Sequence, residues 1–410
     1  MKKTIMEEER TKIAAFLASV EGVGRRILLR TLEQCVSPEN VFYCNESENP
    51  LFCDKKRKEL ILGSLRMDYS VELGGETVGD ELLERSIAAG DVLLREWKIQ
   101  GIDFYPCFSE KYPMRLRCLE DHPFGLFVKG GLPEEEVPAV AIIGARACSD
   151  YGKKVTEYFA GELAAKGVRI ISGMARGIDG IGQKKAIDAG GRTYGVLGCG
   201  VDVCYPKEHR RLYDAISEHG GIISEYRPGT AAHHGLFPER NRIISGLADV
   251  ILVVEARKRS GTYITVTQAL EQGKEIFVVP GRITDALSEG CNHLLGEGAA
   301  LASSPEKILQ FLNSRFYSGW KKEKQSDFNK SNGMFYSGMQ EGNEGKMRKA
   351  IYGLLDDTPK HLNQIFEELK RTDSEILPGR VMEQLTEMVC DGQILGHGCY
   401  FYRNSSQFYN

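Results

Sequence analysis

The stretch from Val140 to Asp179 constrains the fold of this chain more than any other part of the sequence. It contains two short, mostly apolar runs, Val140–Ile143 and Arg169–Ile171, separated by a segment with helical spacing at 151–166. A short apolar run without polar alternation is typical of a strand that is buried on both faces of a parallel sheet. The stretch therefore predicts a strand, a helix and a second strand parallel to the first.

A glycine-containing turn follows each of these predicted strands, at 144–146 and at 172–179. Parallel strands end at the same edge of a sheet, so we expect the two turns to lie side by side, each opening a helix. A helix N-terminus presents unpaired backbone N–H groups and a partial positive charge. Because Arg146 and Arg176 lie within the turns, the arrangement predicts a site for an anion, most simply a phosphate.

The alternation of strands and helices continues along the chain. Further strands are expected at 193–197, 222–225, 250–254 and 276–279, with helices at 182–190, 208–219, from 237 onward and up to 272. Two more strands, at 101–105 and 124–130, precede Val140. This order predicts an α/β fold, a doubly wound parallel sheet that binds its ligand in the crevice beyond the carboxyl ends of the strands.

The candidate binding residues lie at turns or on helices near that edge. Backbone amides of both turns are expected to hold a phosphate, with Arg146 closing over it through a charge-assisted hydrogen bond. Further cations are expected to contact neighbouring phosphates, and Phe237 is either a core residue or a platform on which a base stacks. The full set is Gly144, Ala145, Arg146, Ser172, Gly173, Arg176, Lys184, Phe237, Arg240, Asn241, Arg242 and Gly261.

Sequence motifs for other chemistries are missing. There is no G-x-G-x-x-G run with an acidic residue about 20 positions on, and no G-x-x-x-x-G-K-[ST]. Asp179 is interpreted as a helix-start or arginine-pairing residue, Glu255 as either catalytic or arginine-paired, and His233–His234 as loop polarity or a phosphate contact. The eleven cysteines form no C-x-x-C pair, so we expect no metal site. Because the nucleotide-binding motifs are missing too, we expect no cofactor.

Residues 1–80 are expected to form a helical N-terminal domain. The range 7–35 predicts two helices joined around Gly22 and Gly24, which fits a helix-hairpin-helix unit or a plain helix turn. Because the formal net charge is −4, a nucleic acid would have to bind through a local basic patch. Many free cysteines, no signal peptide and no apolar run of membrane-spanning length indicate a reducing cytosol.

A series of motifs carries a resemblance to a known family. AIIGAR, SGMARGID, GVLGCGVDVCYPKEH, SEYRPG, FPERNRIISGLAD, VEARKRSGTYITVTQA and VVPGRI follow one another in order. Together they resemble the bacterial DNA-processing protein A family (DprA, also called Smf). The resemblance implies an extended Rossmann-like domain that binds single-stranded DNA. It also implies a cytoplasmic homodimer that loads the RecA recombinase onto incoming DNA in natural transformation, without catalytic activity.

The chain departs from this family pattern at three places. Ala145 stands where the family usually has Ser or Thr, and Ser260–Thr265 replaces the common SGSLIT. The loop at 282–290 also differs. These departures concern the expected phosphate contacts and leave the expected fold unchanged.

We expect the Rossmann-like domain to cover 81–312, followed by a flexible linker at 313–345 that is rich in Ser, Gly, Lys, Asn and Gln. Residues 346–410 predict three helices and a two-stranded wing, which resembles a winged-helix domain. This domain holds eight Lys/Arg against nine Asp/Glu, and its third helix carries Glu383 and Glu387 against Arg380. Because a negative recognition helix repels phosphate, the charges favour a protein-interaction module over a second DNA-binding head.

A second class of function remains as the alternative, a nucleotide-processing enzyme that resembles nucleoside monophosphate phosphoribohydrolases on the same fold. Such enzymes carry a PGG-x-GT-x-x-E run. The nearest match here, Ser260–Thr262, lacks the leading Pro-Gly-Gly and has Thr265 at the position of the Glu. The sequence therefore favours a binding protein.

Overall fold

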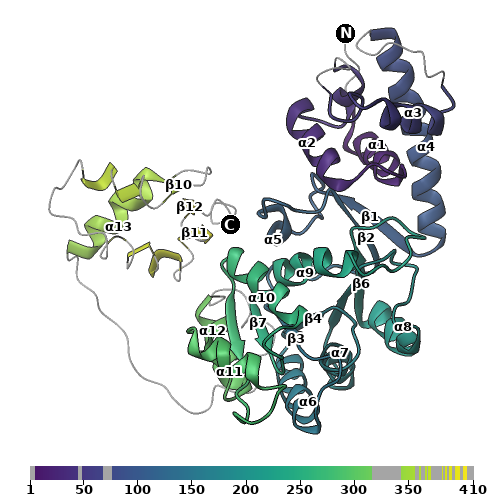
Figure 1. The fold of residues 1–410 in the computed structure, drawn as a ribbon. Helices are drawn as coiled ribbons and strands as arrows, with labels where there is room; N and C mark the ends of the chain where they lie inside the picture. The colour runs from purple at the N-terminus through teal and green to yellow at the C-terminus, as the bar shows by residue number, and fades with distance from the viewer. Residues whose placement is uncertain are drawn as a thin grey trace. The chain divides into compact units, whose positions relative to one another are not determined.

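The computed structural model describes residues 5–44, 49–67, 76–315 and 343–355, together with parts of 360–403. The chain divides into two compact units, Met1–Ile308 and Leu309–Asn410. Figure 1 shows both as ribbons. Within the ranges described, every helix is too short or too polar to cross a lipid bilayer.

The first unit contains a nine-stranded sheet in the order β1-β2-β6-β5-β4-β3-β7-β8-β9. The strands from β6 to β9 in that order pair in parallel, and β1 and β2 add an antiparallel edge next to β6. Their bounds are β1 (Ile102–Pro106), β2 (Gly125–Gly130), β3 (Ala139–Ile143), β4 (Arg169–Ser172), β5 (Thr193–Val196), β6 (Gly220–Ser224), β7 (Val250–Val253), β8 (Glu275–Val278) and β9 (Ala300–Leu301).

The predicted parallel α/β sheet is confirmed. The burial of its strands explains why they could be recognised from apolar runs in the sequence. Every residue of the central strands β3, β5 and β7 is buried. Such strands favour continuous apolar runs because helices cover both of their faces. Strand β9 was not predicted, since two residues are too short to carry a pattern.

Helices cover both faces of the sheet. They are α5 (Met114–Arg117), α6 (Asp150–Ala165), α7 (Ile178–Asp188), η2 (Lys207–His209), α8 (Arg210–His219), α9 (Leu236–Leu247), α10 (Gly261–Glu271), α11 (Glu289–Gly296) and α12 (Pro305–Arg315). Helices α7 and α9 both pack over β3, β4 and β5, which places them on opposite faces.

The chain order creates a switch point between β3 and β7. From β3 the chain proceeds through β4 and β5 to β6, and α9 then carries it back to β7 on the other side of β3. Connections therefore leave the carboxyl ends of β3 and β7 in opposite directions, which opens a crevice there.

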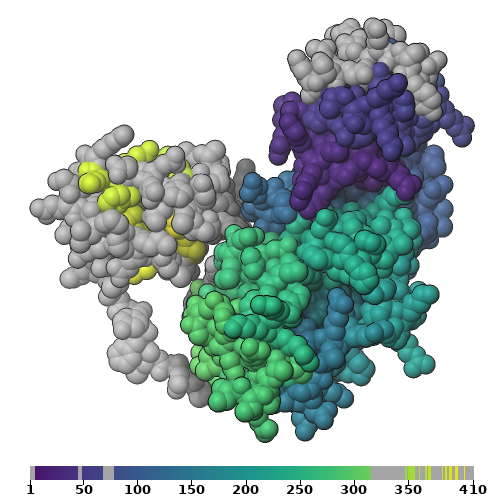
Figure 2. Space-filling view, in the orientation of Figure 1, coloured from purple at the N-terminus to yellow at the C-terminus, as the bar shows by residue number. Residues whose placement is uncertain are grey.

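The N-terminal segment forms α1 (Glu7–Ser19), α2 (Arg25–Cys35), η1 (Glu39–Phe42), α3 (Lys55–Ser64) and α4 (Glu76–Ile99). These helices share an apolar core with the sheet: the ring of Trp97 lies 5.9 Å from that of Phe104 and 5.0 Å from that of Phe127. Figure 2 shows the N-terminal helices in direct contact with the part of the chain that forms the sheet. Helix α4 continues across residue 80, where the sequence placed a domain boundary, and that boundary stays a prediction. The helix-hairpin-helix class of α1 and α2 also stays a prediction.

The second unit contains α13 (Asn343–Leu354) and a small sheet of β10 (Lys360–His361), β12 (Tyr400–Arg403) and β11 (Ile394–His397). The antiparallel pair β11–β12 lies where the wing was expected. Arg380 and Glu383 lie outside the described residues, as does most of the predicted linker. The winged-helix class therefore stays a prediction.

Candidate nucleic-acid interface

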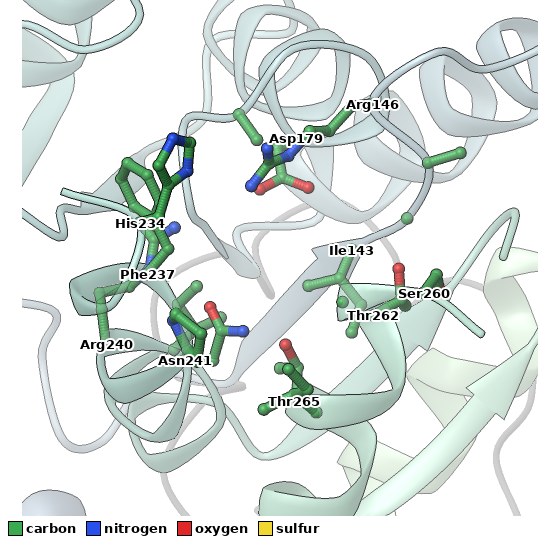
Figure 3. A pocket seen from close by; sticks show the side chains of 17 residues that line it. Ile143, Arg146, Asp179, His234, Phe237, Arg240, Asn241, Ser260, Thr262 and Thr265 are labelled. Atoms are coloured by element: carbon green, nitrogen blue, oxygen red, sulfur yellow. The ribbon is translucent and has the colours of Figure 1, made fainter. Parts of the chain in front are cut away.

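A pocket of about 430 Å³ lies at the switch point, beyond the carboxyl ends of β3 and β7. Figure 3 shows Ile143 at its floor, Arg146 and Asp179 on one side, α9 on a second side and the start of α10 on a third. Its lining residues are Ile143, Gly144, Ala145, Arg146, Ala175, Asp179, His234, Phe237, Pro238, Arg240, Asn241, Ile244, Ser260, Gly261, Thr262, Ile264 and Thr265.

The two predicted turns pack against each other. The backbone N–H of Ile178 donates to the carbonyl of Ala145 at 3.2 Å, and a Cβ atom added at Gly177 would lie 2.3 Å from that oxygen. Gly177 also has a positive φ of 73°, so only glycine fits here without strain. This close approach brings Arg146 from the first turn and Asp179 from the second into one pocket.

Arg146 is exposed at the mouth of the pocket. Its guanidinium carbon lies 5.9 Å from the centroid of the Phe237 ring. Across the part of the chain that the structure describes, no carboxylate forms an ion pair with Arg146. Its charge is therefore available to a ligand.

The second turn differs from its expected role. The backbone N–H of Gly173 donates to Oδ2 of Asp179 at 3.1 Å, and the buried hydroxyl of Ser172 donates to the carbonyl of Ile142 at 2.7 Å. Desolvation raises the pKa of Asp179, and the charge of Arg240 opposes this rise. The carboxylate of this chain thus occupies the place where the sequence analysis put a phosphate, because the side chain of Asp179 folds back onto the turn.

Arg240 lines the pocket but is buried. Its Nη1 donates to the carbonyl of Gly173, which follows β4, at 2.9 Å and to that of Val196, which ends β5. Burial lowers the pKa of Arg240 to about 10, against the opposing charge of Asp179. Arg240 therefore links α9 to the ends of β4 and β5. Its positive charge lies below the surface of the pocket.

Arg242 lies outside the pocket, contrary to the expectation that it contacts a phosphate there. Its side chain is 2% exposed and pairs with Glu225 at 2.5 Å and Asp121 at 3.1 Å. Residues two apart on a helix face different directions, so Arg240 and Arg242 cannot serve one site. Arg25 of α2 also reaches Glu225, at 3.0 Å, so this network joins α9 to the N-terminal helices.

Two other predicted cations are also paired outside the main pocket. Arg176 is exposed and bridged to Glu208, in a second small pocket that borders the first. Lys184 pairs with Asp188 at 3.4 Å, in a groove between α7 and α8. Neither residue lines the larger pocket, although Arg176 and Arg146 both line the second one.

The start of α10 faces into the pocket opposite Arg146. Ser260 occupies the N-cap position without a side-chain cap bond, and its buried Oγ has no hydrogen-bond partner among the described residues. A Cβ atom added at Gly261 would meet nothing within 4 Å, so the approach to this terminus is open. The unpaired hydroxyl and the helix N-terminus together suit an anion.

Asn241 and Thr265 complete the polar lining. Thr265 follows Gly261 by one helical turn and was missed, because only the start of α10 carried a sequence signal. Thr265 lines the pocket because residues four apart in a helix lie on the same face, so it faces the same way as Gly261.

Phe237 stands at the rim of the pocket and is half-buried. Its ring stacks on Tyr205 with centroids 5.3 Å apart and an interplanar angle of 24°. The ring of His234 meets it edge-on at 6.3 Å. Tyr205 was not among the predicted residues, since nothing local in the sequence links it to a residue 32 positions away.

Glu255 has a structural contact, and no arginine of the described residues pairs with it. It is 2% exposed and accepts hydrogen bonds from the backbone N–H of Ser149 at 2.9 Å and from its hydroxyl at 2.5 Å. It therefore anchors the first turn of α6, just after the loop that bears Arg146.

The fold and the pocket define a class of protein: a doubly wound α/β protein with a pocket at its switch point whose polar lining suits an anion. Residues 103–313 match the model of the family described as DNA recombination-mediator protein A. The chain belongs to this family. The family consists of recombination mediators, so the chain is not an enzyme.

Individual relatives agree with this assignment. The chain is 39% identical over 252 residues to DNA processing protein DprA of Streptococcus pneumoniae, covering 62% of this chain and 87% of the relative. It is 44% identical over 208 residues to protein Smf of Escherichia coli, covering 50% and 56% of the two chains. The X-ray structure of the Streptococcus pneumoniae DprA aligns with a TM-score of 0.55 at 33% identity, covering 75% of this chain and 98% of that one.

Proposed function

We propose that this chain binds single-stranded DNA in the pocket beyond the carboxyl ends of β3 and β7. In this proposal it is a cytoplasmic recombination mediator, works as a homodimer, and loads the RecA recombinase onto incoming DNA during natural transformation. Membership of the DNA recombination-mediator family supports the DNA-processing role. The pocket supplies a site of suitable chemistry.

The unpaired charge of Arg146 carries the proposal. Among the predicted cations, Arg176, Lys184 and Arg242 each pair with a carboxylate, and Arg240 is buried against carbonyls. Arg146 alone of this group stands at the pocket mouth without a described carboxylate partner. In a recombination mediator, the anion that Arg146 contacts would be a phosphate of the DNA backbone.

The opposite wall suggests where that phosphate sits. The amides at the start of α10, near Gly261, would hold it from one side while Arg146 closes from the other. Gly144 and Ala145 would contribute backbone, and Asn241 a side-chain amide. Phe237 would stack a base, and such contacts tolerate any sequence because every base has a ring face.

The chain organisation is part of the proposal. A helical domain at 1–80 precedes a DNA-binding domain at 81–312, a linker at 313–345 and a winged-helix-like domain at 346–410. The last domain would contact a protein rather than DNA. The carboxylate of Glu387 on the expected recognition helix would repel phosphate, and its pairing with Arg348 at 2.6 Å offsets part of that charge.

Fluorescence anisotropy of labelled oligo(dT) at several salt concentrations tests the pocket. Arg146→Ala should weaken binding and reduce the slope of log affinity against log salt by about 1, as for one lost phosphate contact. Arg95→Ala is the matched control, because Arg95 is 77% exposed on α4, away from the pocket. It should leave both quantities unchanged.

Two other outcomes of the anisotropy experiment would contradict the proposal. If the wild-type chain binds and Arg146→Ala binds equally well, the DNA site lies elsewhere, and Arg26→Ala in the N-terminal hairpin becomes the next variant. If the wild-type chain fails to bind even at low salt, the single-strand DNA proposal is wrong.

A further inference from the structure

A second, smaller pocket adjoins the one that contains the start of α10. Arg146, Ala175, Phe237 and Arg240 line both. Beyond this shared rim, the second pocket is lined by Gly173, Arg176, Leu197, Gly198, Cys199, Tyr205 and Pro206. A ligand that passes over Phe237 and Arg146 therefore goes directly from one pocket into the other.

Tyr205 covers one face of the Phe237 ring. The two rings are stacked, with centroids 5.3 Å apart, and Gly198 makes room for Phe237: a Cβ atom there would lie 2.8 Å from its Cδ1. Because this face is occupied, a base that stacks on Phe237 must use the opposite face. The stacked pair therefore leaves two faces on its outside, the far face of Phe237 and the far face of Tyr205.

The outer part of Tyr205 is open to solvent. The residue is 43% exposed, although a large aromatic side chain gains free energy by burial. The neighbouring Pro206 is buried, so the backbone beside the ring is anchored while the ring itself projects outward. An exposed aromatic ring on an anchored loop, next to cations, is the geometry that single-strand binding proteins use to stack bases.

We propose that Tyr205 is a second stacking platform, which holds another nucleobase of the same DNA strand in the smaller pocket. This inference rests on the proposed single-strand DNA function and adds a second base position to it. One base would stack on Phe237 and another on Tyr205, at the two ends of the ring pair. Arg146 lies at the shared rim, and Arg176 lines the smaller pocket, where its bond to Glu208 can be exchanged for a phosphate.

The variant Tyr205→Leu keeps an apolar side chain over Phe237 but removes the ring face, and Tyr205→Phe keeps the ring. With labelled oligo(dT), Tyr205→Leu should weaken binding by about 5- to 150-fold, the range for one lost base stack. Because no charge is lost, its dependence on salt should run parallel to that of the wild type. Tyr205→Phe should bind like the wild type, and so should Tyr158→Ala, a control at a tyrosine that is 50% exposed on α6.

Photo-cross-linking separates contact from mere support of Phe237. Oligo(dT) carrying one 5-iodouracil at successive positions is irradiated with the wild-type chain, and the adducts are mapped by peptide mass spectrometry. We expect an adduct on Tyr205 from a different nucleotide than the one that gives the adduct on Phe237. A residue that only supported Phe237 would give no adduct.

The results distinguish failure of this inference from failure of the proposed function. If the wild-type chain binds oligo(dT) but Tyr205→Leu binds equally well, or if adducts form on Phe237 and never on Tyr205, the second platform is wrong while the pocket stands. Loss of binding in Tyr205→Phe would also overturn it, because the hydroxyl and not the ring would then be the contact. Absence of wild-type binding would overturn the function itself.

Discussion

The carboxylate of Asp179 accepts a hydrogen bond from the backbone N–H of Gly173 at 3.1 Å, at the carboxyl end of β4. An anion of the chain itself thus occupies one of the two helix-start turns at the pocket. The amide of Gly173 is therefore occupied by this carboxylate, so the groups left for a ligand anion are Arg146 and the start of α10.

Gly173 should tolerate no side chain, because the groups around it are crowded. A Cβ atom there would lie 2.7 Å from Nη2 of Arg240 and 2.9 Å from Oδ2 of Asp179. Gly173→Ala should lower the free energy of unfolding by about 1–3 kcal/mol, the usual cost of overpacking. Urea denaturation measures this. Gly296→Ala is the control, since a Cβ atom at Gly296 meets nothing within 4 Å, and equal destabilisation by both variants would contradict the argument.

Arg242 should matter for stability and not for DNA binding. Arg242→Met leaves the buried carboxylate of Glu225 with Arg25 alone, so we expect a loss of about 3 kcal/mol, the lower end of the range for breaking a buried ion pair. The double variant Glu225→Gln/Arg242→Met should recover part of this loss, because no unpaired carboxylate remains. Urea denaturation gives the stabilities. A variant that stays fully stable but loses affinity for oligo(dT) would show that Arg242 contacts DNA after all.

Glu134 should make stability depend on pH. Its carboxylate pairs with Arg169 at 2.9 Å and Arg192 at 2.8 Å. Partial burial acts to raise the pKa of Glu134, yet the hydrogen bond and charge of Arg169 and the charge of Arg192 outweigh it and lower the pKa below its ordinary value. The pair therefore stabilises the fold above the ordinary glutamate pKa and loses this effect as pH falls through the lowered one.

The comparison of the wild type with Glu134→Gln tests this direction. The wild type should be the more stable of the two near neutral pH, and the difference should shrink as the pH is lowered below about 4. Urea denaturation at a series of pH values measures the difference. A gap that stays constant or widens toward low pH would show that the carboxylate charge is not what stabilises this edge.

Ser149 should be a strong N-cap for α6. Its Oγ accepts from the backbone N–H of Gly152 at 3.1 Å and donates to Glu255. Ser149→Ala should cost about 1–2 kcal/mol, because it removes the cap and leaves a buried carboxylate oxygen without its donor. Ser64→Ala on the surface of α3 is the control and should change the midpoint of thermal unfolding little. Similar effects from both variants would argue against the cap.

The elements of the sheet and the position of Arg146 followed from the sequence alone. Val140–Ile143 is apolar without alternation because helices cover both of its faces, and this burial pattern is local along the chain. The glycines at 144 and 173 likewise identified the strand ends. Since all parallel strands end at one edge, the place of Arg146 at that edge needed no distances.

Only the tertiary structure decided how the polar groups at that edge are partnered. Arg240 and Arg242 stand two residues apart in one motif, yet one supports the pocket from beneath and the other pairs with Glu225. Tyr205 meets Phe237 only because a loop after β5 passes beside the start of α9. Periodicity and turn chemistry are properties of neighbouring residues, whereas hydrogen bonds and ring stacking depend on distances in space between residues far apart in the chain.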